Sequence, residues 1–166
     1  MLTEHAKVMA LLKDAGEVVG RKKLQKMVYI SKKMKLPFQE RYNFHMFGPY
    51  SEELTLRVEE LSNLGFVKEV KEKKAGYYQY RYALTEDGET FLKKFPLEWP
   101  DEKAKGMVES MNTHPSKFLE LVSTILYFDD LPKAEVKEKV FTLKKKQNYS
   151  EEDIEEAYHY IHSLKH

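Results

Sequence analysis

The sequence predicts a mostly helical α+β protein, and three observations support this class. Apolar residues recur at steps of three and four along most of the chain, which is the spacing of one face of a helix. Residues 77–84 instead alternate between two kinds of side chain, and residues 66–73 precede them across a short turn, as in a β-hairpin. Residues that cap or break helices stand between these segments. We therefore expect several helices around one hairpin.

Four helices and one hairpin are predicted in the N-terminal part of the chain. Thr3, Ser51 and Thr85 are the expected N-caps, because their hydroxyl oxygens can accept a hydrogen bond from a backbone N–H of the first helical turn. Pro37 ends the second helix, since the residue before a proline disfavours helical backbone angles. The predicted elements are helices from residue 4 to about 15, over 21–36 and over 52–64, strands over residues 66–73 and 77–84, and a helix from residue 86 to about 92.

This order of elements is typical of a winged helix-turn-helix, in which a hairpin called the wing follows the third helix. We expect a winged-helix domain over residues 1–97 and a C-terminal helical region over residues 98–166. The C-terminal region is predicted to contain a helix over about 101–111 and helices that begin at Pro115, Pro132 and Ser150. The apolar stripes of these helices predict that the region packs on the winged helix or forms the interface of a homodimer.

Composition excludes several classes of protein. The 28 basic and 27 acidic residues nearly cancel, so global charge does not predict a nucleic-acid partner. The chain has no cysteine, which excludes disulfides, thiolate nucleophiles and cysteine-ligated zinc. No stretch approaches the roughly 20 apolar residues that span a bilayer, and the start lacks the apolar run of a secretory signal. We expect a cytoplasmic protein without a membrane partner.

Three short motifs resemble those of a known family. They are KLQKMVY at residues 23–29, FGPYS at residues 47–51 and LSNLGFV at residues 61–67. These motifs look like the YwgA family of uncharacterised bacterial proteins. Residues 2–92 also resemble the Panacea (SocA-like) antitoxin domain, whose members neutralise unrelated toxins, in one case as an adaptor that delivers a toxin to a protease. The resemblance implies a protein-binding module of the antitoxin or adaptor type.

The motif residues have a mainly structural interpretation. Gly48 and Pro49 form a turn that Tyr50 can plug, and Ser51 caps the helix that follows. Turn and cap chemistry explains the motif without a ligand, and direct contact with a partner is the alternative. The motif residues are Leu24, Gln25, Tyr29, Gly48, Pro49, Tyr50 and Ser51.

The third predicted helix has an acidic outer face. Four glutamates stand against one arginine between residues 52 and 64, although the helix before a wing usually enters the DNA major groove. Such a face would repel phosphates, so a protein partner fits it better. A solvated face is the alternative, because a single exposed leucine is ordinary. The candidate partner-binding residues on this face are Glu52, Leu56, Glu59 and Asn63.

The second predicted helix is basic. Seven basic residues and no acidic residue lie between positions 20 and 35, and four candidate residues share one stripe opposite Leu24. The tyrosine of this stripe could stack on a nucleic-acid base or be buried against a partner, and an acidic protein surface could bind the lysines. Solvation is again the alternative. The stripe consists of Lys22, Lys26, Tyr29 and Lys33.

The aromatic residues of the wing have two interpretations. Tyr78, Tyr80 and Tyr82 share one side of the second strand with Leu84, so the period of two predicts that they belong to the core. A platform on which bases stack is the alternative, because the first strand carries several lysines.

No catalytic, metal or cofactor site is predicted. The sequence has no nucleophile elbow, no His-Glu-x-x-His motif and no glycine-rich phosphate loop. Glu155, His159, His162 and His166 share one face of the last predicted helix, but no ligand from a second segment accompanies them. The sequence therefore predicts a non-enzymatic binding protein with a protein partner. The alternative is a DNA- or RNA-binding regulator that uses the basic second helix and the wing.

Overall fold

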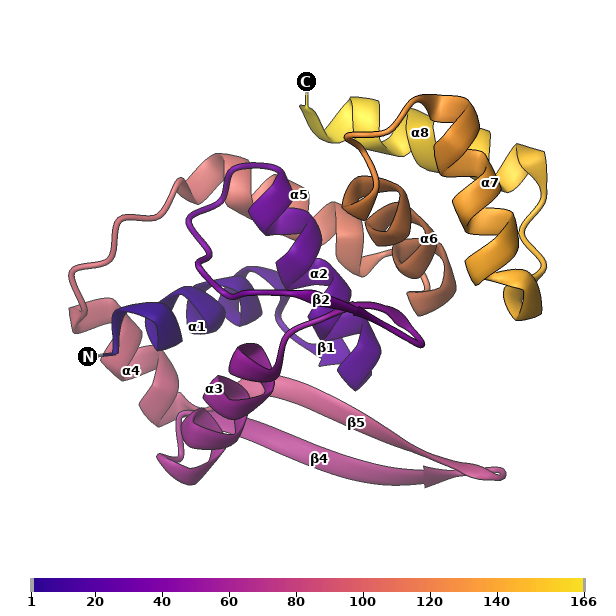
Figure 1. The fold of residues 1–166 in the computed structure, drawn as a ribbon. Helices are drawn as coiled ribbons and strands as arrows, with labels where there is room; N and C mark the ends of the chain where they lie inside the picture. Colours follow the sequence, from indigo (N-terminus) through magenta and orange to yellow (C-terminus); the bar gives the residue numbers. More distant parts are fainter. Residues whose placement is uncertain (1, 166) are drawn as a thin grey trace.

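The computed structural model describes residues 2–165, in which helices and two small antiparallel sheets alternate (Figure 1). The chain is α+β and mostly helical, as the sequence predicts. The N-terminal elements are α1 (Thr3–Ala15), β1 (Val18–Val19), α2 (Arg21–Lys33), β2 (Asn43–His45), β3 (Gly48–Tyr50), α3 (Glu52–Asn63), β4 (Val67–Lys74), β5 (Tyr77–Leu84) and α4 (Glu86–Lys94). The C-terminal elements are α5 (Asp101–Asn112), α6 (Ser116–Tyr127), α7 (Lys133–Leu143), a 3-10 turn (Lys145–Gln147) and α8 (Glu151–Lys165).

Hydroxyl caps start α3 and α4 at the predicted positions. Ser51 Oγ accepts a hydrogen bond from the Leu54 N–H at 3.1 Å, and Thr85 Oγ1 accepts one from the Gly88 N–H at 3.0 Å. Each hydroxyl satisfies a backbone donor that has no partner within its own helix. The prediction for Thr3 is wrong, because this residue already lies inside α1 and a cap must stand just outside the helix.

The larger sheet has the strand order β1–β5–β4, and all its pairs are antiparallel. β4 and β5 pair along their full length and have nearly the predicted boundaries. The far end of this β4–β5 hairpin projects beyond the helices (Figure 1). Tyr82 is buried near the base of the hairpin, and Tyr80 is half-buried. The prediction that Tyr78 belongs to the core is wrong: it is 56% exposed, because no helix covers the far end.

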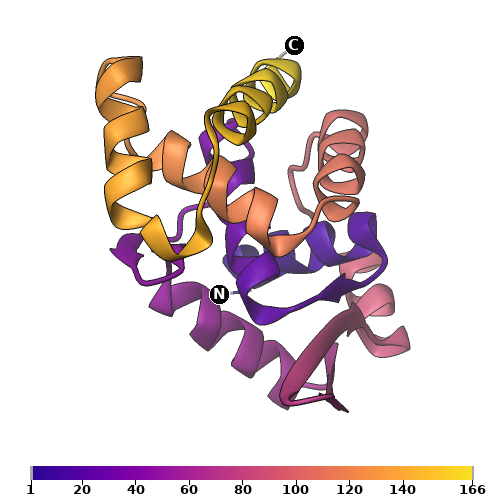
Figure 2. The same cartoon turned by 90° about the vertical axis from the view of Figure 1, so that its right-hand side faces the viewer.

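Helices α1 and α2 form the centre of the molecule. α5 packs beside α1, α6 packs against α2, and α8 packs on α6. These C-terminal helices lie on the side away from the β4–β5 hairpin (Figures 1 and 2). One continuous core joins the two parts of the chain, since Leu11 and Met27 belong to the same buried cluster as Met107 and Ile125. No helix within the described residues is long and apolar enough to cross a membrane.

Two β elements were not predicted. β1 has only two residues, which pair with Tyr82 and Arg81 of β5. A segment of this length has no period that could identify it as a strand. The β2–β3 hairpin lies in the aromatic connector before α3, where Asn43 pairs with Tyr50 and His45 pairs with Gly48. Its strands are also too short for a pattern of alternation to stand out.

Two helix ends differ from the prediction. α2 ends at Lys33, before the expected boundary, and Lys35 then adopts a φ of 74°. The third helix was predicted to extend to residue 64, but Leu64 lies outside α3 and is 52% exposed. The reason is that α3 ends at Asn63 and Leu64 lies where the chain turns away.

Candidate partner-binding groove

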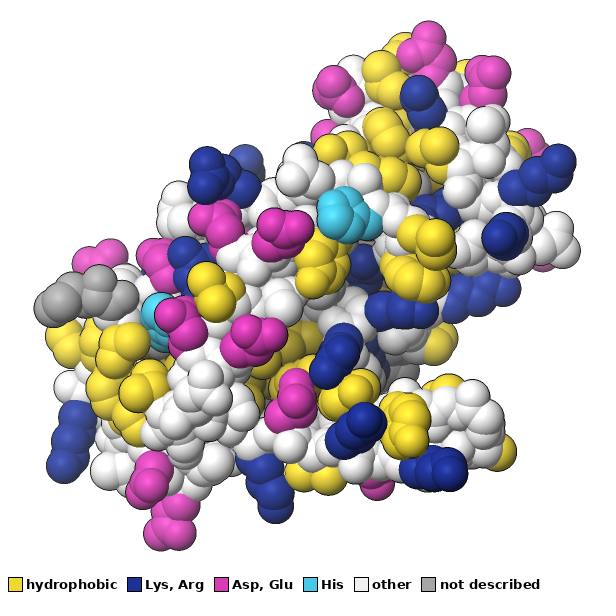
Figure 3. All heavy atoms as spheres, turned by 60° about the horizontal axis from the view of Figure 1, so that its bottom comes forward, with side chains coloured by type: hydrophobic (Ala, Val, Ile, Leu, Met, Phe, Trp, Pro, Cys, Tyr) yellow, Lys and Arg dark blue, Asp and Glu magenta, His cyan; other side chains and the backbone are white. Residues whose placement is uncertain are grey.

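A hollow of about 460 Å³ opens between the start of α2, the first part of α3, the β2–β3 hairpin and the larger sheet. Its floor is apolar, because Leu24, Leu54, Val58 and Tyr82 line it and are buried. Figure 3 shows this side of the molecule, with hydrophobic side chains inside the hollow and charged side chains on its borders. The volume lies within the range of ligand pockets in proteins. We call this hollow the groove.

Charged residues border the groove on two sides. Two of the cations lie over aromatic rings: the Arg21 guanidinium carbon is 3.7 Å from the ring centroid of Tyr80, and Lys22 Nζ is 3.3 Å from that of Phe47. These contacts place the cations at the edge of the groove. The bordering charged residues are Arg21, Lys22 and Lys26 from α2, Glu59 from α3 and Glu69 from β4.

Two buried lysines hold the β2–β3 hairpin beside the groove. Lys26 Nζ donates a hydrogen bond to the Pro49 carbonyl at 2.9 Å, and Lys144 Nζ donates one to the Met46 carbonyl at 2.8 Å. Lys144 also forms an ion pair with Glu120 of α6 at 3.1 Å. Burial lowers the pKa of Lys26 to about 8, and the charge of Glu120 opposes this shift. The position of the hairpin therefore depends on α2 and on the C-terminal region together.

Gln25 joins α2 to the start of α3. Its Nε2 donates to the Ser51 carbonyl at 2.9 Å, and the Ser51 N–H donates back to its Oε1 at 2.9 Å. Nε2 also donates to Thr55 Oγ1 at 3.1 Å, and the Tyr50 hydroxyl shares a hydrogen bond with the same oxygen at 2.8 Å. These bonds position α3, which is one wall of the groove. They agree with the structural interpretation of the motif.

Gly48 occupies a position that favours glycine. Its φ is 91°, in the left-handed region that side chains disfavour. A Cβ atom there would lie 3.5 Å from Glu120 Cγ and 3.5 Å from Lys26 Cε, which is ordinary van der Waals contact, so the backbone angle is the reason for glycine. The motif residue Leu24 lies on the floor of the groove. The motif residues therefore shape the groove, and most of them are not on its open surface.

The predicted basic stripe on α2 is not an exposed surface. Lys26 and Tyr29 are buried, because α6 and β3 pack against this face of the helix. The ring of Tyr29 packs edge-on against Tyr42 with a centroid distance of 4.9 Å. Lys33 is half-buried and pairs with Asp129 at 3.4 Å. Lys22 alone among the four stripe residues is exposed.

The outer face of α3 is exposed, in agreement with the helical period. Glu52, Glu59 and Asn63 are exposed, and Leu56 between them is 56% exposed. Glu59 also borders the groove, so this face is adjacent to it. Contact of this face with a partner remains a prediction.

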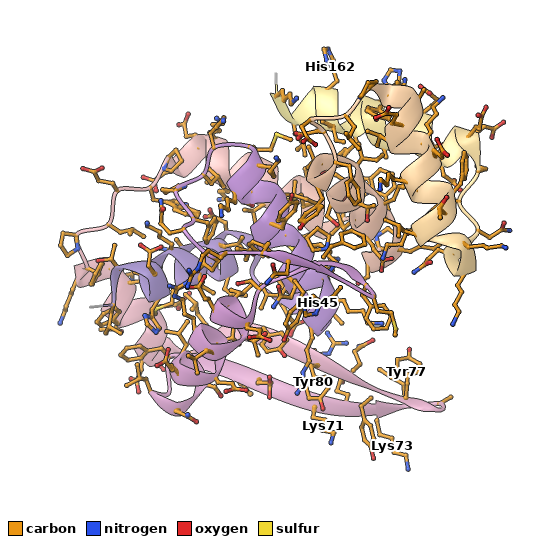
Figure 4. All side chains as sticks on the ribbon, in the orientation of Figure 1. His45, Lys71, Lys73, Tyr77, Tyr80 and His162 are labelled. Atoms are coloured by element: carbon orange, nitrogen blue, oxygen red, sulfur yellow. The ribbon has the colours of Figure 1, made fainter. Side chains whose placement is uncertain are left out.

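The tip of the β2–β3 hairpin adds exposed apolar residues that the sequence analysis missed. Met46 is 79% exposed, and Phe47 beside it is also exposed. His45 stacks on Tyr50 with a centroid distance of 4.9 Å. In Figure 4, His45 lies on this hairpin above Tyr80 of the β4–β5 hairpin. The aromatic run of the connector was the available signal, but it has no helical or strand period.

The acidic and histidine residues of α8 lie away from the groove. Among residues 2–165, no group of three or more His, Asp or Glu side chains could hold a metal ion. Glu155 instead forms ion pairs with Lys133 and Lys137, both at 3.0 Å. His162 lies on the far side of the molecule from the groove (Figure 4), and His166 lies outside the described residues.

Together, these elements define a mostly helical α+β protein with an open, partly apolar groove. The chain is 62% identical over 165 residues to the uncharacterized protein YwgA of Bacillus subtilis (strain 168). The match covers 99% of this chain and 98% of that protein. The chain therefore belongs to the YwgA family, as the motifs indicated. No protein-family model matches it. The name of the relative states no activity, so the function is inferred from the groove and its borders.

Proposed function

We propose that the protein is a non-enzymatic binding protein whose partner is another protein. The observation that carries this proposal is the apolar surface around the groove. The buried floor continues into the exposed side chains of Met46 and Phe47, and Leu56 is exposed on the adjacent face of α3. Apolar side chains gathered beside a hollow are typical of interaction sites, because a partner's apolar atoms would remove them from water.

We also propose that α1–α4 and the larger sheet form a winged helix over residues 1–97, with the β4–β5 hairpin as its wing. The element order α1–β1–α2–β2–β3–α3–β4–β5, in which the β2–β3 hairpin is an insertion between α2 and α3, and the strand order β1–β5–β4 support this architecture. The helix before the wing usually enters the DNA major groove, but α3 exposes Glu52 and Glu59 there. A winged helix with this charge suits a protein surface better than phosphates.

The basic residues of α2 are largely engaged within the chain, which argues against nucleic acid. Lys23 Nζ donates to the Asn112 carbonyl at 2.7 Å, and Lys32 Nζ donates to the Glu40 carbonyl at 2.5 Å. Lys26 is buried. Ammonium groups held in this way are poorly placed to neutralise phosphates, which supply most nonspecific affinity for nucleic acid.

One observation favours nucleic acid as the second candidate. Tyr77 and Tyr78 are exposed near the far end of the β4–β5 hairpin, and Lys71 Nζ lies 4.2 Å from the ring centroid of Tyr78. Figure 4 shows Lys71, Lys73 and Tyr77 on this part of the hairpin. Bases stack on exposed tyrosines and lysines neutralise phosphates, so the wing could bind a single strand.

The resemblance to the Panacea antitoxin domain supports a specific form of the proposal, a toxin-neutralising or adaptor-like role. Gln25 and Ser51 belong to the motifs that carry this resemblance, and their hydrogen bonds position one wall of the groove. A toxin or another protein client would then occupy the groove and the outer face of α3. A cytoplasmic location is part of this proposal, because a chain without cysteine suits a reducing compartment.

The test compares two exposed leucines, Leu56 on α3 and Leu64 directly after its end. Leu56 and Leu64 are 56% and 52% exposed, so an aspartate at either position should leave the fold intact. Full-length protein captures partners from a lysate of the source organism, and each captured protein is purified and titrated against the variants. We expect Leu56→Asp to weaken binding by about tenfold or more, because it places a charge within an apolar contact. Leu64→Asp, just beyond the C-terminal end of α3, is the matched control and should not change the affinity.

Mobility-shift titrations with duplex DNA and single-stranded RNA at two salt concentrations test the second candidate. Binding that weakens steeply with salt, is unchanged by Leu56→Asp and is lost with Tyr78→Ala would contradict the proposal and favour the wing.

A further inference from the structure

We propose that the groove binds a short segment of the partner protein that carries a large apolar side chain next to a carboxylate. This inference rests on the proposed function and adds the chemistry of the bound segment. The apolar side chain would lie on the floor near Leu54 and Val58, and the carboxylate would lie against Lys22 and Lys26 of α2.

The apolar half of this ligand follows from the floor of the groove. Leu24, Leu54, Val58 and Tyr82 converge there from two helices and the larger sheet. A volume of about 460 Å³ is enough for a short segment, and apolar floors of this kind gain affinity by removing a side chain from water. The floor therefore selects for a large apolar residue.

The position of the carboxylate follows from the charges on the borders. The cations Arg21 and Lys22 come from α2, whereas the acids Glu59 and Glu69 come from α3 and β4. Glu69 lies close enough to Arg21 to stabilise its charge, so Arg21 already has an acidic neighbour. A carboxylate of the ligand is therefore attracted to Lys22 and Lys26 and repelled by Glu59. The first turn of α2 adds to this preference: its cap residue, Gly20, provides no side-chain acceptor, and a helix begins at its positive end.

Lys26 provides an independent observation, because its ammonium has more donors than partners. It has three N–H groups, and the hydrogen bond that it donates within the described chain goes to the Pro49 carbonyl at 2.9 Å. Lys26 is 2% exposed and borders the groove. Burial lowers its pKa to about 8; Glu120 opposes this shift, and Lys144 and Lys22 add to it. A carboxylate in the groove would accept a hydrogen bond from Lys26 and stabilise its charged form.

The tip of the β2–β3 hairpin completes the site. Lys22 Nζ lies 3.3 Å from the ring centroid of Phe47, so this cation stays at the edge of the groove. The neighbouring Met46 is 79% exposed, and its flexible side chain can pack on ligands of different shape.

The test uses short random peptides displayed on phage and selected on the full-length protein. Recovered peptides are synthesised and titrated by calorimetry. We expect them to combine Leu, Phe or Met with Asp or Glu. Replacing that carboxylate by its amide should weaken binding by about tenfold or more, because a charge-assisted hydrogen bond is lost. Lys22→Glu should have an effect of similar size. Lys13→Glu is the matched control, since Lys13 is exposed on α1 outside the groove.

Proton uptake on peptide binding is a second readout. If Lys26 had only a structural role, its protonation would not change when the peptide binds, and no uptake from it would be measured. At a pH near the Lys26 pKa of about 8, a bound carboxylate raises this pKa and the complex takes up part of a proton. Titrations in two buffers with different ionisation enthalpies measure this uptake. It should disappear in Lys26→Met. If Lys26→Met fails to fold, the exposed Lys22 variant still tests the inference.

Peptides without acidic residues, or affinities that Lys22→Glu leaves unchanged, would overturn the inference. A second outcome separates the two proposals. Leu56→Asp could abolish binding of a purified partner, while the peptides do not displace that partner and Lys22→Glu does not weaken its binding. The inference about the groove would then fail while the proposed function stands. Binding of nucleic acid alone would overturn both.

Discussion

Replacing Gln25 by leucine should destabilise the protein strongly, although the change retains most of the side-chain volume. The side chain makes two hydrogen bonds with the Ser51 backbone at 2.9 Å and a third with Thr55 Oγ1 at 3.1 Å. Ser51 is fully buried, so its N–H would lose its partner without access to water. The Ser51 carbonyl would still accept from the Thr55 N–H at 3.3 Å. The main loss of stability therefore comes from the Ser51 N–H, which would be buried without a hydrogen-bond acceptor.

An unsatisfied buried donor costs about 1–3 kcal/mol, and the bond to Thr55 adds about 1 kcal/mol. We therefore expect Gln25→Leu to lower the free energy of unfolding by about 2–4 kcal/mol. Urea titrations can follow this loss through the fluorescence of Trp99, the single tryptophan, which donates to Asp14 at 3.1 Å. With a urea dependence of about 2 kcal/mol per molar, the midpoint should fall by about 1–2 M.

The matched control is Gln79→Leu on β5. The Gln79 amide makes one weak hydrogen bond, to Glu72 at 3.4 Å, so its loss should change the free energy of unfolding by less than about 0.5 kcal/mol. Equal midpoints for wild type and Gln25→Leu would refute the structural interpretation of the motif. Gln25 would then be retained for contact with a partner.

Three further predictions concern the core, a buried charge and the C-terminal region. Tyr82→Ala should lower the free energy of unfolding in urea by about 2–4 kcal/mol, because Tyr82 is buried. Tyr78→Ala should lower it by less than about 0.5 kcal/mol, because Tyr78 is exposed, and equal losses for the two variants would contradict this prediction. The pKa of Lys26 falls from 10.5 to about 8 on folding, so the unfolded chain binds more protons between these pH values. The free energy of unfolding should therefore rise with pH over this range. If the rise persists in Lys26→Met, a group other than Lys26 causes it. A chain truncated after Leu97 should aggregate or change its association state in light scattering, because α5 and α6 complete the core. A stable monomer with an unchanged unfolding midpoint would mean that the two regions are independent.

The helices and the longer hairpin could be predicted because their signals are local. Ser51 and Thr85 cap through bonds to residues three positions ahead, so the cap and its partner are adjacent in the sequence. The strands β4 and β5 also follow one another and are long enough to alternate. β1 depends instead on pairing with β5, where Val18 lies opposite Tyr82. The two residues of β1 are too few to show a strand period, and their pairing partner β5 is too far away in the sequence to produce a local signal.

The sequence by itself determined which side chains share a face of a helix, whereas the tertiary structure alone decided which faces are covered. The period of α3 correctly placed Leu56 on the outside, because no later segment packs over it. The same period aligned Lys22, Lys26 and Tyr29 on α2, but α6 covers that face and leaves only Lys22 of the three exposed. The groove exists because α2, α3, the β2–β3 hairpin and the larger sheet converge. Helical spacing gives a direction around one axis, and what lies in that direction depends on packing against distant segments.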